Sequence, residues 1–185
     1  VKKDIEAAGF VLVREGNFDL DEFGWLMRLG QPYFLKPSID GHWQSKYPVA
    51  TPILVTPLYV PAVQWLAARG IADDDVRFRA LALLIDRVAA AAIAAVSVAL
   101  VLLGAATMAP TSTAIAVALV YAFATNTWTV TSGALWQHGL AQVSLAGLSL
   151  CFLRPDSGRR ALATGLFAGL GVAARPIAAV FAGLA

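Results

Sequence analysis

The chain has 185 residues, of which 58% are hydrophobic and only 14% are charged, and its mean hydropathy is +0.68. Soluble domains average about 45–50% apolar residues, and the 66 residues between Arg87 and Arg154 include no Asp, Glu, Lys or Arg. The composition therefore predicts a membrane protein and excludes an ordinary soluble domain. A net charge of +2 without a basic stripe also argues against nucleic acid as a partner.

Residues 1–50 form a first compositional unit, with seven acidic and six basic residues among interleaved aromatics. This mixture predicts an external, periplasmic or extracellular loop with short interfacial helices. Asp40-Gly41 is a turn signal, and the residues on either side of it predict a short hairpin between 33–35 and 42–44.

Residues 51–70 are apolar but carry three prolines, Pro52, Pro57 and Pro61. Proline lacks the backbone N–H donor, and a segment that crosses lipid must satisfy its own backbone groups. We therefore expect an interfacial or re-entrant helix here and no full crossing.

Residues 80–185 are expected to form about four transmembrane helices. Asp73-Asp74-Asp75 predict the cap of a helix that runs to about Leu103. Further apolar segments follow at residues 111–125, 135–153 and 161–184. The basic connection 154–160 is expected in the cytoplasm, which places the connection 128–138 outside. The predicted fold is all-α, a polytopic transmembrane helix bundle, and we expect a piece of a longer protein, truncated at both ends.

The sequence predicts neither a metal site nor a cofactor. Cys151 is the single cysteine, and the cysteine and histidines match no zinc spacing. Residues 169–174 fit a dinucleotide-binding pattern, but no strand is expected before them and no acid follows. Gly165 and Gly169 are interpreted instead as a small-xxx-small contact between helices.

The external loop contains two groups of candidate residues. Asp19, Asp21 and Glu22 place three carboxylates within four residues, and burial beside a bilayer would raise their pKa toward values useful for a general base. The alternative is a solvated acidic turn. His42 and Lys46 lie just before the proline-rich segment, where Lys46 either pairs with a lipid phosphate or extends to the interface without a specific partner.

The apolar half contains a third group of candidates. Trp136 and His138 lie at the outer end of an expected span, where His138 is either a binding residue or a packing residue. Arg175 is the only charge after Arg160. Its burial in an apolar segment requires a phosphate or carboxylate partner, and a structural ion pair is the alternative.

Several short motifs occur in a characteristic order, namely Arg14–Phe23, Tyr33-Phe34, Asp40–Trp43, Ser45–Pro48, Leu135–Gly139 and Arg175-Pro176. This order resembles bacterial multi-pass proteins of glycosyltransferase superfamily C, near the protein O-mannosyltransferase and aminoarabinose transferase branch. The resemblance implies an inverting enzyme of the bacterial inner membrane. Such an enzyme transfers a hexosyl or pentosyl group from a polyprenyl-phosphate donor to an acceptor at the outer face.

The resemblance also implies roles for the candidate residues. A carboxylate of the first external loop would be the catalytic base, and Asp4 or a residue before Val1 is the alternative to the acidic group named above. Lys46-Tyr47-Pro48 falls where the family has Lys-Pro-Pro, which meets the lipid phosphate. The implied catalytic residues are Asp19, Asp21 and Glu22, and the implied substrate-binding residues are His42, Lys46, Trp136, His138 and Arg175.

Two other classes of protein stay open at this point. A transporter or flippase segment also contains buried polar groups and broken helices, and a non-catalytic membrane subunit needs no chemistry. The long acidic and aromatic loop favours the transferase, and the isolated Arg175 argues against the subunit.

Overall fold

The computed structural model describes residues 12–13, 16, 19–21, 35–71, 75–155 and 157–183, without the side chains of Arg79, Phe181 and Ala182. Of the described residues, 73% are helical and 5% are in strands, so this part of the chain is mostly helical, in agreement with the predicted all-α class. The chain divides into two compact units, residues 1–89 and 90–185, and each is described by itself.

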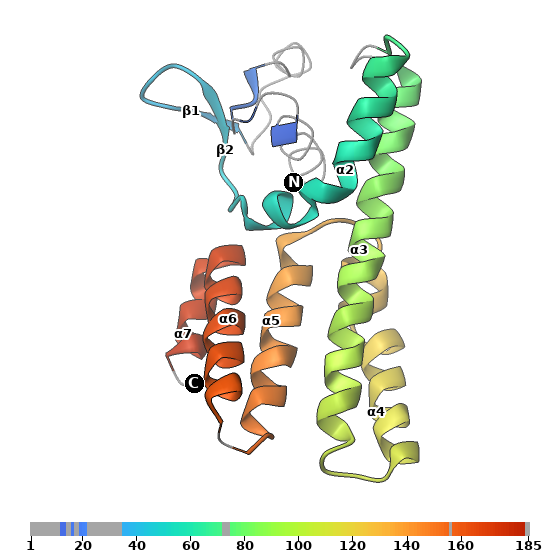
Figure 1. Ribbon diagram of the computed structural model, residues 1–185, viewed down its shortest axis with the longest axis vertical. Coiled ribbons are helices and arrows are strands. Elements are labelled where there is room, and N and C mark those ends of the chain that lie inside the picture. The colour runs from blue at the N-terminus through green and yellow to red at the C-terminus, as the bar shows by residue number, and fades with distance from the viewer. Residues whose placement is uncertain are drawn as a thin grey trace. The chain divides into compact units, whose positions relative to one another are not determined.

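The first unit contains the predicted hairpin (Figure 1). Strand β1 (Leu35–Pro37) pairs antiparallel with β2 (Trp43–Ser45), in a register that places Leu35 opposite Ser45. Gly41 has φ +86°, a conformation that glycine adopts without steric cost, which explains why the turn forms at Asp40-Gly41. The hairpin is thus confirmed, with its strands at 35–37 and 43–45 where the sequence predicts 33–35 and 42–44, and residues 33 and 34 lie outside the described part.

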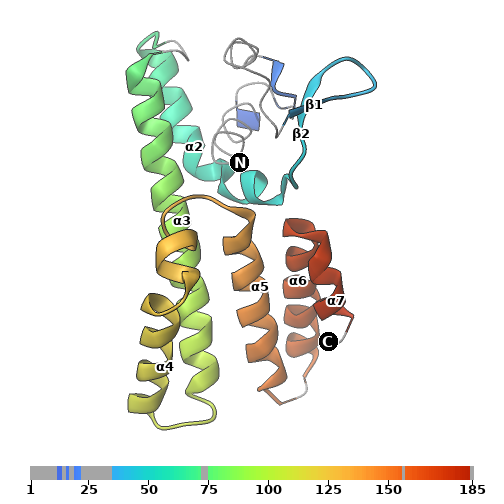
Figure 2. The ribbon, with the colours of Figure 1, turned by 180° about the vertical axis from the view of Figure 1, so that it is seen from behind.

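Helix α2 (Ala50–Ala68) is continuous over 19 residues even though Pro57 and Pro61 lie inside it. Figures 1 and 2 show that the helix bends along its length, as expected where proline removes a backbone donor. The Thr56 hydroxyl donates to the carbonyl of Pro52 at 2.8 Å, a side-chain bond that also bends helices. The prolines therefore bend this helix without ending it, and its placement at the interface stays a prediction.

Helix α3 (Val76–Ala105) has 30 residues and confirms the predicted helix and its cap. Asp75 Oδ1 accepts a hydrogen bond from the backbone N–H of Arg77 at 2.7 Å, which satisfies a donor that the first turn leaves free. Its first part belongs to the first unit and its second part to the other. Within the described residues, α2 and α3 are the two helices long and apolar enough to cross a membrane.

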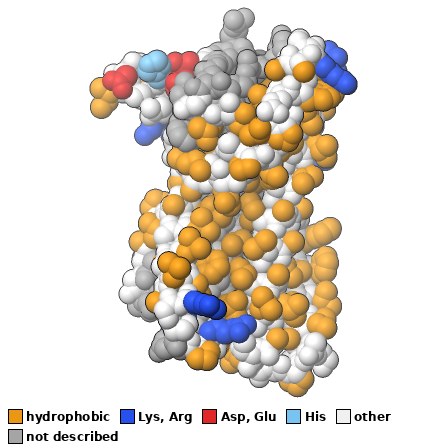
Figure 3. Space-filling model, viewed as in Figure 1, with side chains coloured by type: hydrophobic (Ala, Val, Ile, Leu, Met, Phe, Trp, Pro, Cys, Tyr) orange, Lys and Arg blue, Asp and Glu red, His pale blue; other side chains and the backbone are white. Residues whose placement is uncertain are grey.

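The second unit contains the second part of α3 and the short helices that follow it. They are α4 (Thr111–Phe123), the π-helix η2 (Thr127–Thr131), α5 (Gln137–Phe152), α6 (Gly158–Ala174), the 3-10 helix η3 (Pro176–Ala178) and α7 (Ala179–Ala182). Helices α5 and α6 run antiparallel, side by side (Figures 1 and 2). Figure 3 shows hydrophobic side chains over most of the visible face of this unit, with basic ones gathered where α5 connects to α6.

The last apolar segment is interrupted, where the sequence predicts one continuous stretch from 161 to 184. Helix α6 ends at Ala174, and Arg175 is extended, with φ −149° and ψ 114°. Pro176 explains this end, because proline disfavours the helical conformation in the residue before it and lacks an N–H of its own. Helix α7 then returns beside α6 (Figures 1 and 2).

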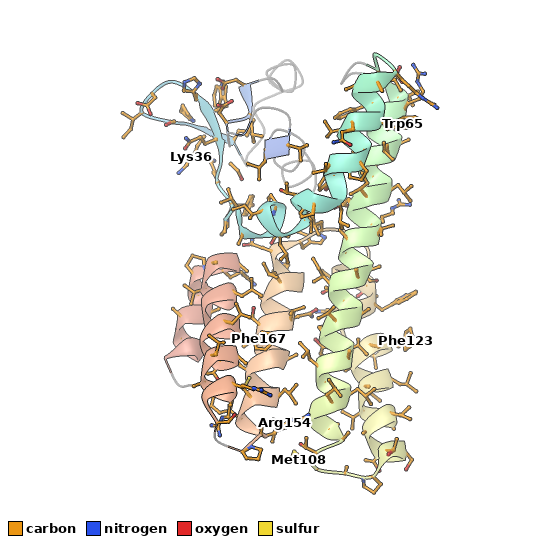
Figure 4. The ribbon with its side chains drawn as sticks, viewed as in Figure 1. Lys36, Trp65, Met108, Phe123, Arg154 and Phe167 are labelled. Atoms are coloured by element: carbon orange, nitrogen blue, oxygen red, sulfur yellow. The ribbon has the colours of Figure 1, made fainter. Side chains whose placement is uncertain are left out.

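Glycines allow α5 and α6 to approach each other closely, but at positions other than the predicted ones. A Cβ added at Gly147 would lie 2.4 Å from the ring of Phe167, a residue of α6 (Figure 4). At Gly165 and Gly169 nothing described lies within 4 Å of an added Cβ. The predicted contact through Gly165 and Gly169 is therefore wrong for the helices described here, because both glycines lie on an exposed face of α6.

Candidate functional site

The hairpin of the first unit holds the carboxylate of Asp21 at both of its oxygens. Oδ1 accepts a hydrogen bond from the backbone N–H of Trp43 at 2.7 Å, and Oδ2 lies 2.6 Å from Nδ1 of His42. The neighbouring Leu20 is buried, and its backbone N–H donates to the carbonyl of Trp43 at 2.8 Å. Asp19 forms an isolated backbone bridge with Gln44. Two predicted site residues 21 positions apart, Asp21 and His42, are thus brought together.

The two partners shift each other's titration in opposite directions. The Trp43 N–H, followed by His42, lowers the pKa of Asp21, and the hydrogen bond to Asp21 raises the pKa of His42. The side chains of His42 and Asp21 are 56% and 41% exposed, so solvent screens the pair. Near neutral pH, the pair is an ionised carboxylate that orients an imidazole and favours its protonated form.

The pKa shift of Asp21 is opposite to the predicted one. Burial beside a bilayer would raise this pKa, but the carboxylate is partly exposed and accepts two hydrogen bonds, and both favour its charged form. Asp21 is therefore a weak base. Nε2 of His42 makes no hydrogen bond within the described part of the chain and can exchange a proton.

The other candidates of the loop are not part of this pair. Lys46 directly follows β2, is exposed, and makes no ion pair or hydrogen bond with any described residue. Glu22 and Asp4 lie outside the described residues.

The second unit brings together His138 and Arg175, which are 37 positions apart. Nη1 of Arg175 lies 2.9 Å from Nδ1 of His138. A guanidinium only donates hydrogen bonds and stays protonated in proteins, so Nδ1 must be the acceptor. The imidazole is therefore neutral, with its proton on Nε2.

Local structure fixes this second pair. His138 lies in the first turn of α5, and Arg175 lies at the break after α6, where its backbone N–H donates to the carbonyl of Gly171 at 2.9 Å. Trp136 is the residue that precedes α5, and its ring centroid is 6.3 Å from that of His138. All three side chains are half-buried. Three predicted substrate-binding residues thus meet at one end of α5 and α6.

The positive charge of Arg175 is not neutralised by a carboxylate in the described part of the chain. No described carboxylate lies within ion-pair distance of Arg175, so the structural ion pair weighed as an alternative is not found there. The first turn of α5 contains no acid and has no side-chain cap. The cluster presents hydrogen-bond donors, the His138 Nε2–H and the remaining guanidinium N–H groups, beside a helix N-terminus. This arrangement suits an anion such as a phosphate.

Sequence reasoning missed Asp86, which is completely buried in the first part of α3. Asp86 is the one acid in the sequence of α3, and this was the available signal, because ionisable residues in membrane helices are commonly functional. It also missed the Trp43 N–H that binds Asp21, for which no side-chain pattern gives a signal.

Among the described residues no group of three His, Cys, Asp or Glu side chains is arranged to hold a metal ion. Comparisons with protein families, with curated proteins and with solved structures find no match to this chain.

Proposed function

We propose that this chain belongs to a multi-pass glycosyltransferase of the bacterial inner membrane, which uses a polyprenyl-phosphate-linked sugar as donor at the outer face. The observation that carries the proposal is the pairing of Arg175 with His138, a cationic cluster of donors without a described carboxylate. The motif order resembling glycosyltransferase superfamily C supports it. So do the two helices, α2 and α3, that are long and apolar enough to cross a membrane.

In this proposal the Arg175–His138 cluster binds the lipid phosphate. Negative charge grows on the phosphate oxygen as its bond to the anomeric carbon breaks, so fixed donors stabilise the transition state more than the ground state. Arg175 supplies the permanent charge. The neutral His138 accepts from Arg175 through Nδ1 and directs its Nε2–H outward as a second donor.

Transfer of the sugar forms a bond between the acceptor hydroxyl oxygen and the anomeric carbon and breaks the bond from that carbon to the phosphate oxygen, so polyprenyl phosphate leaves and the hydroxyl proton passes to a base. Within the hairpin, Nε2 of His42 is the atom that can accept a proton, because both Asp21 oxygens already have partners. Asp21 positions the imidazole ring through Nδ1.

The test is lipid binding by the full-length protein. Native mass spectrometry in mild detergent, with polyprenyl phosphate titrated in, measures occupancy for wild type, Arg175→Gln and Arg159→Gln. Arg159 is exposed at the connection between α5 and α6, so its variant controls for general attraction of the phosphate to basic side chains. Loss of a charged hydrogen bond costs about 1.5–3 kcal/mol, so we expect Arg175→Gln to bind about tenfold more weakly or worse.

Equal binding by Arg175→Gln and wild type would remove the phosphate site from the proposal. The helix break at Arg175-Pro176 is also typical of transporters. Reconstituted vesicles separate the two functions, because a transferase releases polyprenyl phosphate when an acceptor is added, whereas a transporter moves its substrate across the vesicle membrane without breaking the glycosyl bond.

A further inference from the structure

The first unit contains an apolar groove between α2 and the first part of α3. Its volume is about 650 Å³, and its walls include Leu58 and Trp65 from α2 and Leu81 and Leu84 from α3. Figure 4 shows where Trp65 projects from α2. Leu58, Trp65 and Leu84 are 45%, 41% and 58% exposed. A groove lined by large apolar side chains is suited to the apolar part of a ligand.

A cationic side chain, Arg69, lies against Trp65, one of the residues that line the groove. The guanidinium of Arg69 lies over the ring of Trp65, with its central carbon 4.3 Å from the ring centroid. Arg69 has no ion pair with any described residue. Because a guanidinium that lies over a ring keeps its N–H donors free at its edge, Arg69 can bind an anion while Trp65 holds it in place.

Arg77 also lines the groove, at the beginning of α3. Its Nε and Nη2 atoms donate to the carboxylate of Asp75, at 3.2 and 2.7 Å, and Arg77 lowers the pKa of Asp75 to about 2. Asp75 therefore stays ionised and fixes the guanidinium, whose Nη1 makes no hydrogen bond with a described residue. Among the described side chains around the groove, Asp75 neutralises Arg77 and Arg69 makes no ion pair, so Arg69 is the described cation that can attract a ligand.

The volume of the groove and the side chains around it indicate which kind of ligand it can bind. Its volume falls within the range of about 300–1,000 Å³ that small-molecule sites occupy, and its walls belong to the two helices that are apolar enough to span a membrane. A ligand that fits must combine a long apolar part with an anionic head group next to Arg69. Membrane phospholipids have this composition.

We propose that the groove binds an anionic phospholipid of the surrounding membrane, with an acyl chain between α2 and α3 and the phosphate against Arg69. This inference is independent of the glycosyltransferase proposal, which concerns Arg175 and the polyprenyl donor. Failure of one therefore leaves the other standing.

The experiment uses the full-length protein in mild detergent, with phosphatidylglycerol titrated in and bound lipid counted by native mass spectrometry. Two variants remove the two halves of the site. Arg69→Gln removes the charge, with Arg159→Gln as its control. Ala80→Phe fills the groove from an exposed position in its wall, and Ala92→Phe places the same ring at an exposed position of α3 outside it.

We expect Arg69→Gln and Ala80→Phe each to weaken retention of phosphatidylglycerol about tenfold, and both controls to retain it as wild type does. Retention unchanged in Arg69→Gln and Ala80→Phe would overturn the proposal, as would an equal loss in Arg159→Gln or Ala92→Phe. Displacement of phosphatidylglycerol by equimolar polyprenyl phosphate, in an Arg69-dependent way, would also overturn it, since the groove would then bind the sugar donor.

Discussion

The two histidines of this chain have opposite partners in the two units. His42 is paired with a carboxylate in an exposed hairpin, whereas His138 is paired with a guanidinium in a half-buried helix corner. The first pairing favours the imidazolium ion, and the second requires the neutral ring. One residue type thus serves a proton-exchanging pair in one unit and a donor cluster in the other.

The two pairs are also held in place by different interactions. The backbone N–H and carbonyl of Trp43, in β2, bind the carboxylate of Asp21 and the N–H of Leu20, and these bonds place Asp21 beside His42. The pair His138–Arg175 instead depends on two antiparallel helices that pack closely at Gly147. A change in helix packing should therefore break the second pair and leave the first intact.

The largest effect is expected for Gly147→Ala. The new methyl group would lie 2.4 Å from the Phe167 ring, so either this ring must leave its position or α5 and α6 must shift. Such overpacking costs about 1–3 kcal/mol in the free energy of unfolding, which denaturant titration in detergent measures. As the control, Gly165→Ala meets open space in a helix and should stabilise by about 0.5–1 kcal/mol. Equal stability of the two variants would contradict the close contact.

A smaller effect is expected for His138→Phe. The substitution removes the acceptor of Arg175 at a cost of about 1 kcal/mol in the free energy of unfolding, because solvent still reaches the half-buried guanidinium. His138→Gln keeps a side-chain acceptor and should recover part of this loss. If both variants unfold like wild type, the hydrogen bond contributes nothing to stability.

The smallest effect on stability is expected for Asp21→Asn, because its partner His42 is exposed. NMR titration of the imidazole should show the pKa of His42 above 6.5 in wild type and closer to 6.5 in the variant. The raised pKa means that His42 stabilises the fold below about pH 6.5, and that this contribution is lost as the pH rises through the folded-state pKa. The lowered pKa of Asp21 means that its contribution is present above about pH 3.8 and is lost as the pH falls through the folded-state value. An unchanged His42 pKa in Asp21→Asn would show that the pair does not form in solution.

Much of the helical architecture was predictable because its signals are local. The Asp75 cap, the hairpin turn at Gly41 and the long uncharged stretch in α3 each depend on neighbouring residues. Pro176 also predicts the helix end at Arg175. The residues on both sides are apolar, however, so composition alone predicts one continuous segment. The glycine contacts were not predictable, since Gly147, Gly165 and Gly169 look alike until the facing helix is known.

The candidate residues also divide into features that the sequence predicts and features that only the tertiary structure decides. The sequence alone identified Asp21, His42, His138 and Arg175, because ionisable side chains are conspicuous beside or within apolar segments. Only the tertiary structure decided which of them are partners, and therefore the direction of the pKa shifts of Asp21 and His42 and the tautomer of His138. The physical reason is the separation along the chain over which each interaction acts. Composition and periodicity act over a few residues along the chain, whereas a hydrogen bond between positions 37 apart exists only after two helices have packed.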